Sequence, residues 1–122
     1  MPIEYLVVFR RVLSAAWLNP GEPWAAAVCS MWSNFNSLVE REWARRLQQA
    51  GLAVPAGEVP GSFRGVFGAA MVSTFMGLIG RCGVEKAARI IEEIMPSCIE
   101  EMQLDEDFLR WILATPGETR DN

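Results

Sequence analysis

The sequence predicts an all-α fold: a compact single-domain bundle of five or six helices, with a long second helix and a buried, glycine-containing central helix. Three observations predict it. Apolar residues recur every three to four positions along most of the chain, which is the helical period. Proline and glycine cluster between these stretches, where helices begin and end. A central run of 16 residues, 65–80, carries no charge. Short β-branched or aromatic runs at 5–9 and 66–67 leave a small strand as the alternative there.

The first two expected helices have clear boundaries. Pro2 suits the first turn of a helix over 3–18, whose apolar residues form one broad face, and the Asn-Pro-Gly sequence at 19–21 ends it. A second helix begins at Glu22-Pro23 and extends over 22–50, followed by Gly51 as a left-handed cap. This long helix is expected to be the spine of the bundle.

A loop over 51–61 with two prolines and three glycines separates these helices from the rest. Ser62 is expected to cap a third helix, over 62–79, and a glycine-containing turn at 80–83 follows. The fourth helix is expected over 84–95, because Pro96 should break it.

The C-terminal part predicts two short helices. Residues 97–100 have the Ser-x-x-Glu spacing of a capping box, which indicates a fifth helix. Asp105 can cap a sixth over 106–114, ended by Thr-Pro-Gly. We therefore expect one helical domain over 1–115 and a polar tail over 116–122.

Composition excludes several chemistries. The chain has 122 residues, 51% of them hydrophobic, and no histidine, which removes Ser-His and Cys-His nucleophiles and imidazole metal ligands. We find no catalytic constellation and predict neither a cofactor nor a metal site. Its three cysteines are far apart and predict free thiols in a reducing compartment. The N-terminus lacks the order of a secretory signal, so the expected location is the cytoplasm.

The uncharged run 65–80 raises the question of a membrane. It is shorter than the roughly 20 residues that span a bilayer, and it contains four glycines. We therefore predict no membrane association but a helix buried on all sides, in which Gly65, Gly68 and Gly77 let neighbouring helices approach closely.

Five tryptophans are many for a chain of this length. Most are expected in the core, on the apolar stripe of the second helix. Tryptophan is also enriched at binding hot spots. We therefore predict that at least one of three tryptophans lies at a partner interface: Trp24, Trp43 and Trp111.

Acidic residues are concentrated in one segment. Residues 85–107 hold eight acids and two bases, although i,i+4 pairing and helix N-termini account for part of this excess. The hypothesis is an acidic patch for a basic protein partner. Its candidate residues are Glu92, Glu93, Glu100, Glu101, Asp105, Glu106 and Asp107.

Glu42 and Arg46 continue the apolar stripe of the second helix, in the order that suits an intrahelical ion pair. The favoured interpretation is that the stripe ends before Glu42 and the pair is solvated. The alternative is a pair that is buried or at an interface.

The leading function hypothesis is a non-enzymatic protein–protein interaction module, either an assembly subunit or an inhibitor of a larger protein. Within it, the acidic helices would occupy a basic groove on a nucleic-acid-handling partner, and the protein would be a phage or mobile-element counter-defence factor. Self-association is a further option.

The second hypothesis is a small helical enzyme or ligand-binding protein with a pocket near Trp32, Glu42 and Arg46. The third is a helical nucleic-acid binder using Arg41, Arg45 and Arg46, although so few basic residues argue against direct contact with nucleic acid.

Overall fold

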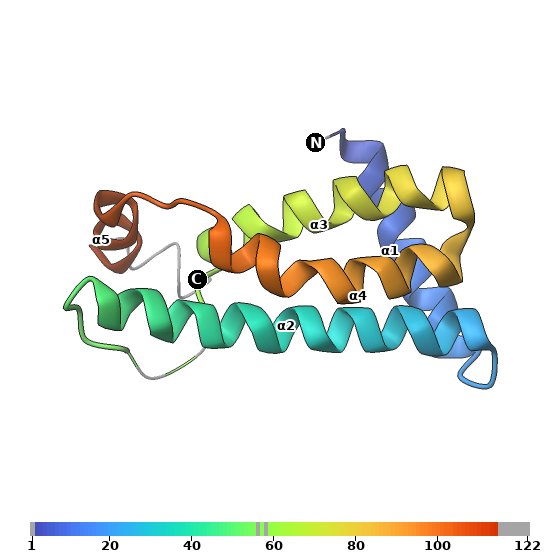
Figure 1. Cartoon of the computed structure of the whole chain (residues 1–122), viewed down its shortest axis with the longest axis horizontal. Coiled ribbons are helices and arrows are strands. Elements are labelled where there is room, and N and C mark those ends of the chain that lie inside the picture. Colours follow the sequence, from blue (N-terminus) through green and yellow to red (C-terminus); the bar gives the residue numbers. More distant parts are fainter. Residues whose placement is uncertain (1, 56, 58, 115–122) are drawn as a thin grey trace.

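The structure, a computed structural model, describes residues 2–55, 57 and 59–114 and confirms the all-α bundle. Within these residues there are five helices and no strand (Figure 1). Position 115 and the expected polar tail over 116–122 lie outside the described residues. The helices are α1 (Ile3–Leu18), α2 (Pro23–Gln49), α3 (Gly61–Cys82), α4 (Val84–Glu101) and α5 (Glu106–Ala114).

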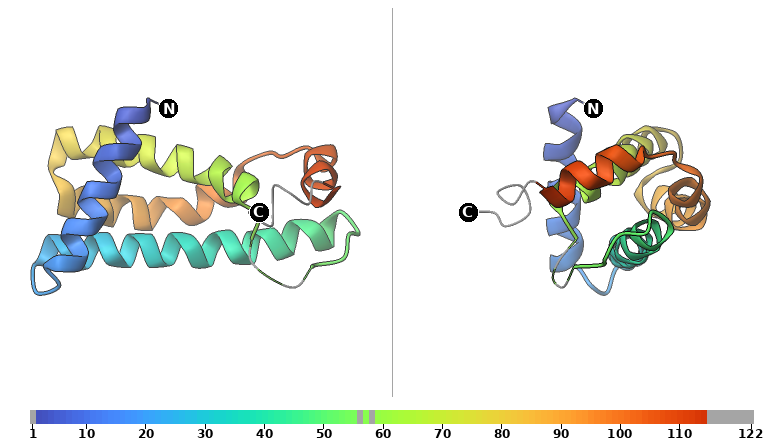
Figure 2. Two further views of the ribbon diagram at one scale, coloured as in Figure 1. Left: turned by 180° about the vertical axis from the view of Figure 1, so that it is seen from behind. Right: turned by 90° about the vertical axis from the view of Figure 1, so that its left-hand side faces the viewer.

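Three helices form the body of the bundle. α2, α3 and α4 lie side by side, α1 crosses one side of them against α2 and α3, and α5 lies across one end (Figure 2). The core between them is rich in aromatic rings. Phe9 of α1 joins it through Trp32 and Phe75, with ring centroids 5.5 and 5.8 Å away. α1 is therefore attached to both α2 and α3.

The ends of α2 follow the sequence closely. Pro23 occupies the first turn, where its missing N–H costs nothing. At the other end Gly51 has a φ of 74°, its N–H donates to the carbonyl of Gln48, and the N–H of Leu52 donates to the carbonyl of Leu47. These two hydrogen bonds form a Schellman motif, so the predicted left-handed cap at Gly51 is confirmed.

α4 departs from prediction. It continues through Pro96 to Glu101, so the expected break and the separate short helix at 97–100 were wrong. Pro96 is exposed, on the side of α4 away from the core. Ile91, Met95 and Ile99 continue one buried face across the proline. Packing of that face outweighs the backbone hydrogen bond that proline removes.

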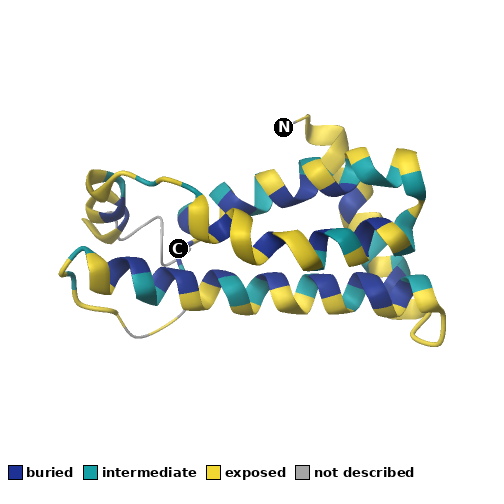
Figure 3. Ribbon diagram, in the orientation of Figure 1, coloured by how far each residue is buried: buried dark blue, intermediate teal, exposed yellow. Residues whose placement is uncertain are grey.

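α3 also differs, because it is buried on one face and not on all sides (Figure 3). A Cβ added at Gly65 or Gly77 would meet no atom within 4 Å, and one at Gly68 would only touch Phe35 at 3.9 Å. The glycines therefore do not mediate close helix packing, and that expectation was wrong. By length and composition α3 could also cross a membrane, with a mean hydropathy of 1.4 in its most apolar window, of which 28% is buried.

Two glycines of α3 and its following turn should respond oppositely to alanine. Gly65→Ala should raise the free energy of unfolding by about 0.5–1 kcal/mol, because alanine lowers the conformational entropy of the unfolded chain. Gly65 is exposed in a helix, and a Cβ added there meets no atom within 4 Å. Gly83→Ala should lower it by about 1 kcal/mol or more, because Gly83 has a φ of 85°. Urea unfolding of both variants measures this, and a destabilising Gly65→Ala would contradict the exposed placement of that face.

Candidate functional site

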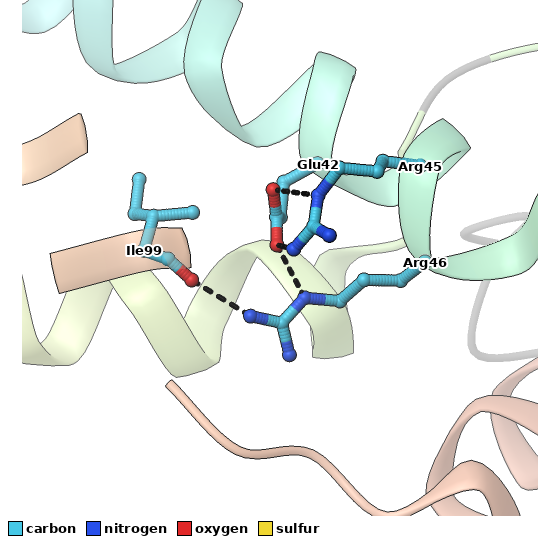
Figure 4. Close-up of polar contacts among 4 residues, drawn as sticks. All are labelled: Glu42, Arg45, Arg46 and Ile99. Carbon is cyan, nitrogen blue, oxygen red and sulfur yellow. Dashed lines mark hydrogen bonds and ion pairs between the residues drawn. The ribbon is translucent and has the colours of Figure 1, made fainter. Parts of the chain in front are cut away.

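Four residues from two helices meet at the end of the bundle near α5 (Figure 4). Glu42, Arg45 and Arg46 lie on successive turns of α2, and Ile99 contributes a backbone carbonyl from the last turn of α4. Arg45 Nε donates to Glu42 Oε1 at 2.9 Å, and Arg46 Nε donates to Glu42 Oε2 at 2.5 Å. The sequence-predicted pair Glu42–Arg46 therefore forms, and Arg45 joins it.

This ion pair is buried, so the favoured solvated interpretation was wrong. Glu42 is 7% exposed and Arg46 is 8% exposed. Burial alone raises the pKa of Glu42 and is the largest single effect, but the hydrogen bonds and charges of Arg45 and Arg46 together outweigh it. The pKa of Glu42 is consequently lowered. The hydrogen bond to Glu42 in turn raises the pKa of Arg45.

Arg46 connects the two helices. Its Nη2 donates to the carbonyl oxygen of Ile99 at 2.7 Å, and its guanidinium lies 5.6 Å from the centroid of the Phe67 ring. Carbonyls in the last turn of a helix have no partner within that helix. Arg46 therefore supplies a hydrogen-bond donor from α2 to a carbonyl at the end of α4. This gives the buried guanidinium a structural role.

A polar cleft of about 290 Å³ lies beside this pair, lined among others by Arg45, Arg46, Gln49 and Glu100. A second cleft, of about 710 Å³, is lined by Trp32 and other residues of α2, α3 and the α2–α3 loop. Trp32 and Arg46, which were predicted to share one pocket with Glu42, therefore line different clefts. Both arginines of the first cleft are already held by Glu42.

Metal and thiol chemistry find little support among the described residues. No group of three or more His, Cys, Asp or Glu side chains there could hold a metal ion. The cysteines are free, as predicted: Cys29 and Cys82 are half-buried, and Cys98 is exposed. The Cys82 thiol contacts the carbonyl of Leu78 in its own helix at 3.3 Å.

Two of the three predicted nucleic-acid residues make ion pairs within the protein. Arg45 and Arg46 are held by Glu42, so Arg41 alone of the three is an exposed arginine without a contact in the described structure.

The acidic candidates separate into two groups. Four of them make contacts inside the protein. Glu92 accepts hydrogen bonds from Ser30 and Asn34 of α2, Asp105 caps α5 by accepting from the N–H of Asp107 at 3.1 Å, and Glu106 pairs with Arg110. Glu100 lies in the cleft beside Arg45 and contributes to raising the pKa of that arginine.

The remaining acidic candidates are exposed: Glu93, Glu101 and the carboxylate of Asp107. The cap by Asp105 was predicted and is confirmed. The predicted patch of seven acids is therefore reduced to three side chains that make no contact in the described structure.

The tryptophans predicted for an interface have three different environments. Trp43 is buried against Phe63, with ring centroids 4.8 Å apart, so it belongs to the core. Trp24 is half-buried. Trp111 is 51% exposed and stacks on Phe108.

The exposed apolar surface of α1 was not predicted. Six large apolar side chains of α1 are exposed, and we call them the outer surface of α1. Two of them, Tyr5 and Trp17, belong to the broad apolar face that was expected to pack inward, so that expectation was wrong for these two residues. The other four lie off that face, and their presence was the signal for a second apolar face. The outer surface comprises Ile3, Tyr5, Val7, Val8, Trp17 and Leu18.

Comparison with protein-family models, with curated proteins and with solved structures gives no match. The functional argument therefore rests on the chain's own residues.

Removing the buried carboxylate should destabilise the protein strongly. Glu42→Gln should lower the free energy of unfolding at pH 7 by about 3–5 kcal/mol, because it leaves the buried Arg46 charge without a counter-ion. The matched control is Glu85→Gln, whose exposed pair with Arg89 should contribute about 1 kcal/mol or less. Equal losses in the two variants would mean that the Glu42 pair is not buried in solution.

The same variant should change the pH dependence of stability. Since the pKa of Glu42 is lowered by folding, its carboxylate stabilises the protein above the unfolded value of 4.5, and this contribution is lost as pH falls through the folded pKa. The stability difference between wild type and Glu42→Gln should therefore be constant near neutrality and shrink below about pH 4.5. Urea unfolding at several pH values measures it, and a difference that grows on acidification would refute the assignment.

Proposed function

We propose that this chain is a non-enzymatic protein–protein interaction module that docks on another protein through the outer surface of α1. The observation that carries the proposal is the number of exposed apolar side chains on one helix: of the ten large ones among the described residues, six lie on α1. They form two groups, residues 3–8 and the pair Trp17–Leu18, with exposed Arg10, Arg11 and Ser14 between them. Single exposed apolar residues are normal on a protein surface, but groups of them mark interaction sites.

The C-terminal end of the helix contributes the most exposed of these side chains. Trp17 is 69% exposed and Leu18 is 81% exposed, beside the α1–α2 turn. Apolar area removed from water contributes about 25 cal/mol per Å², and tryptophan is the side chain most enriched at binding hot spots. Covering this pair is therefore the largest gain that a partner could obtain here.

The three acidic side chains that make no contact in the described structure support a secondary role for charge in partner binding. Glu93 and Glu101 are exposed on α4, and Asp107 is exposed on α5. Such charges affect the rate and orientation of association more than its strength. They favour a basic partner, as expected for an inhibitor or assembly subunit acting on a nucleic-acid-handling protein.

One observation favours a second candidate function, the binding of a small ligand. The polar cleft of about 290 Å³ beside Arg46 is the cavity that such a function requires. Against it, the Nε groups of both arginines already donate to Glu42, and Nη2 of Arg46 donates to the Ile99 carbonyl. Native mass spectrometry of protein purified from its source would reveal a retained ligand.

Affinity purification from the source cells tests docking through α1. Three tagged baits are compared: wild type, the double variant Trp17→Glu/Leu18→Glu, and the control Glu93→Lys/Glu101→Lys. The α1 variant should recover specific partner proteins at least about tenfold less than wild type, because charges replace the apolar contact. The acidic-site control should retain most of them.

Circular dichroism and urea unfolding check that each bait is folded, as expected from the exposure of all four substituted positions. If the α1 variant recovers the same proteins in the same amounts as wild type, the outer surface of α1 is not the docking surface.

A further inference from the structure

The N-terminal end of α1 extends past the body of the bundle, beyond α3 (Figure 2). Residues 3–8 precede Phe9, the first buried residue of the helix. We call residues 3–8 the overhang. Five of its six residues are apolar, and Ile3 is 73% exposed. Leu6 is half-buried and the other five residues are exposed, so the overhang receives little of the cover that an apolar helix obtains from tertiary packing.

The overhang is bordered by opposite charges on its outward side. At 100° per residue, Val7 lies opposite the buried Phe9 and Ala16, and Glu4 and Arg11 flank it on one edge of the same face. Both charged residues are exposed, and within the described part of the chain neither makes an ion pair. An acid and a base thus lie seven residues apart, with Val7 and Val8 midway between them.

We propose that the overhang binds the same segment of a second copy of this chain, with the two helices antiparallel and a two-fold axis beside Val7 and Val8. In that register Glu4 of each copy lies opposite Arg11 of the other, and the valines pack at the centre. This inference rests on the proposed docking role of the outer surface of α1 and names one partner for its N-terminal half.

Charge selects this arrangement over its alternatives. A parallel pair would bring Glu4 against Glu4 and Arg11 against Arg11. An antiparallel pair centred between Arg10 and Arg11 would bring arginines together. Like charges opposed at an interface cost several kcal/mol, so both arrangements are disfavoured.

The size of the contact indicates how strong the dimer is. Residues 4–11 span about 12 Å of helix, so the interface falls in the small class that forms reversible complexes. Trp17 and Leu18 lie beyond the paired segment and stay open to another protein. Self-association and docking can therefore be separated experimentally.

Charge reversal and its complementation test the pairing. In sedimentation velocity over a concentration series, wild type should form dimers. Glu4→Arg alone and Arg11→Glu alone should each weaken dimerisation at least about tenfold, because each variant opposes like charges at both symmetric contacts. An equimolar mixture of these two variants should dimerise again, since both contacts then join an acid to a base. The double variant Glu4→Arg/Arg11→Glu should also recover dimerisation.

Arg10→Glu is the matched control, because Arg10 is exposed on the opposite edge of the outward face. It carries the same charge change as Arg11→Glu and should dimerise like wild type. Circular dichroism confirms that each variant is helical. A wild type that is monomeric at every concentration would overturn the inference, and so would single variants that dimerise normally or a mixture that fails to recover.

Flotation with phosphatidylcholine and phosphatidylglycerol vesicles tests whether the overhang binds a lipid surface in place of a second copy. A monomer that binds these vesicles through the overhang would also overturn the dimer. If dimerisation fails but Trp17→Glu/Leu18→Glu still loses its partners, the proposed function stands without this inference. If dimerisation holds and no recovered protein depends on α1, the proposed function fails and the self-pairing stands.

Discussion

The bundle depends on one buried charge, the guanidinium of Arg46. It links α2 to the last turn of α4 by donating to the Ile99 carbonyl. A buried charge requires a counter-ion, and Glu42 supplies it from one turn earlier on α2. Arg45 then holds the other carboxylate oxygen of Glu42. This connection joins α2 to α4 at the end of the bundle where α5 lies (Figure 1).

The local parts of the fold were predictable because local chemistry determines them. Pro23 and Gly51 mark the ends of α2 through fixed backbone preferences, and Asp105 caps α5 as its residue type indicates. The error at Pro96 has a different origin. A proline breaks a helix unless packing retains both halves, and packing depends on which side of α4 faces α2 and α3. That orientation is tertiary information, and the sequence pattern alone did not weigh it.

The candidate site shows the same difference between features that local sequence determines and features that tertiary packing determines. The helical wheel placed Glu42 and Arg46 on the apolar stripe of α2, so the pair itself was predicted. Its burial was not, because the pattern of one helix does not show that the C-terminal end of α4 packs against it at Ile99. The solvated interpretation rested on where the apolar stripe of α2 ends, and that pattern carries no information about α4. Similarly, the acidic patch was read from net charge, which does not reveal that Glu92 bonds across to α2.

The apolar excess of the chain lies in a different place from its uncharged run. Within the uncharged run 65–80, the exposed residues of α3 are glycine, alanine and threonine, so they expose little apolar area. α1 carries arginines and a glutamate, yet it exposes tryptophan, leucine, isoleucine and valine. Because hydrophobic free energy scales with apolar area and not with the absence of charge, α1 has the stronger drive toward a partner. The charges on α1 do not oppose this drive, since a helix that must bind one partner in one register needs polar groups to select it.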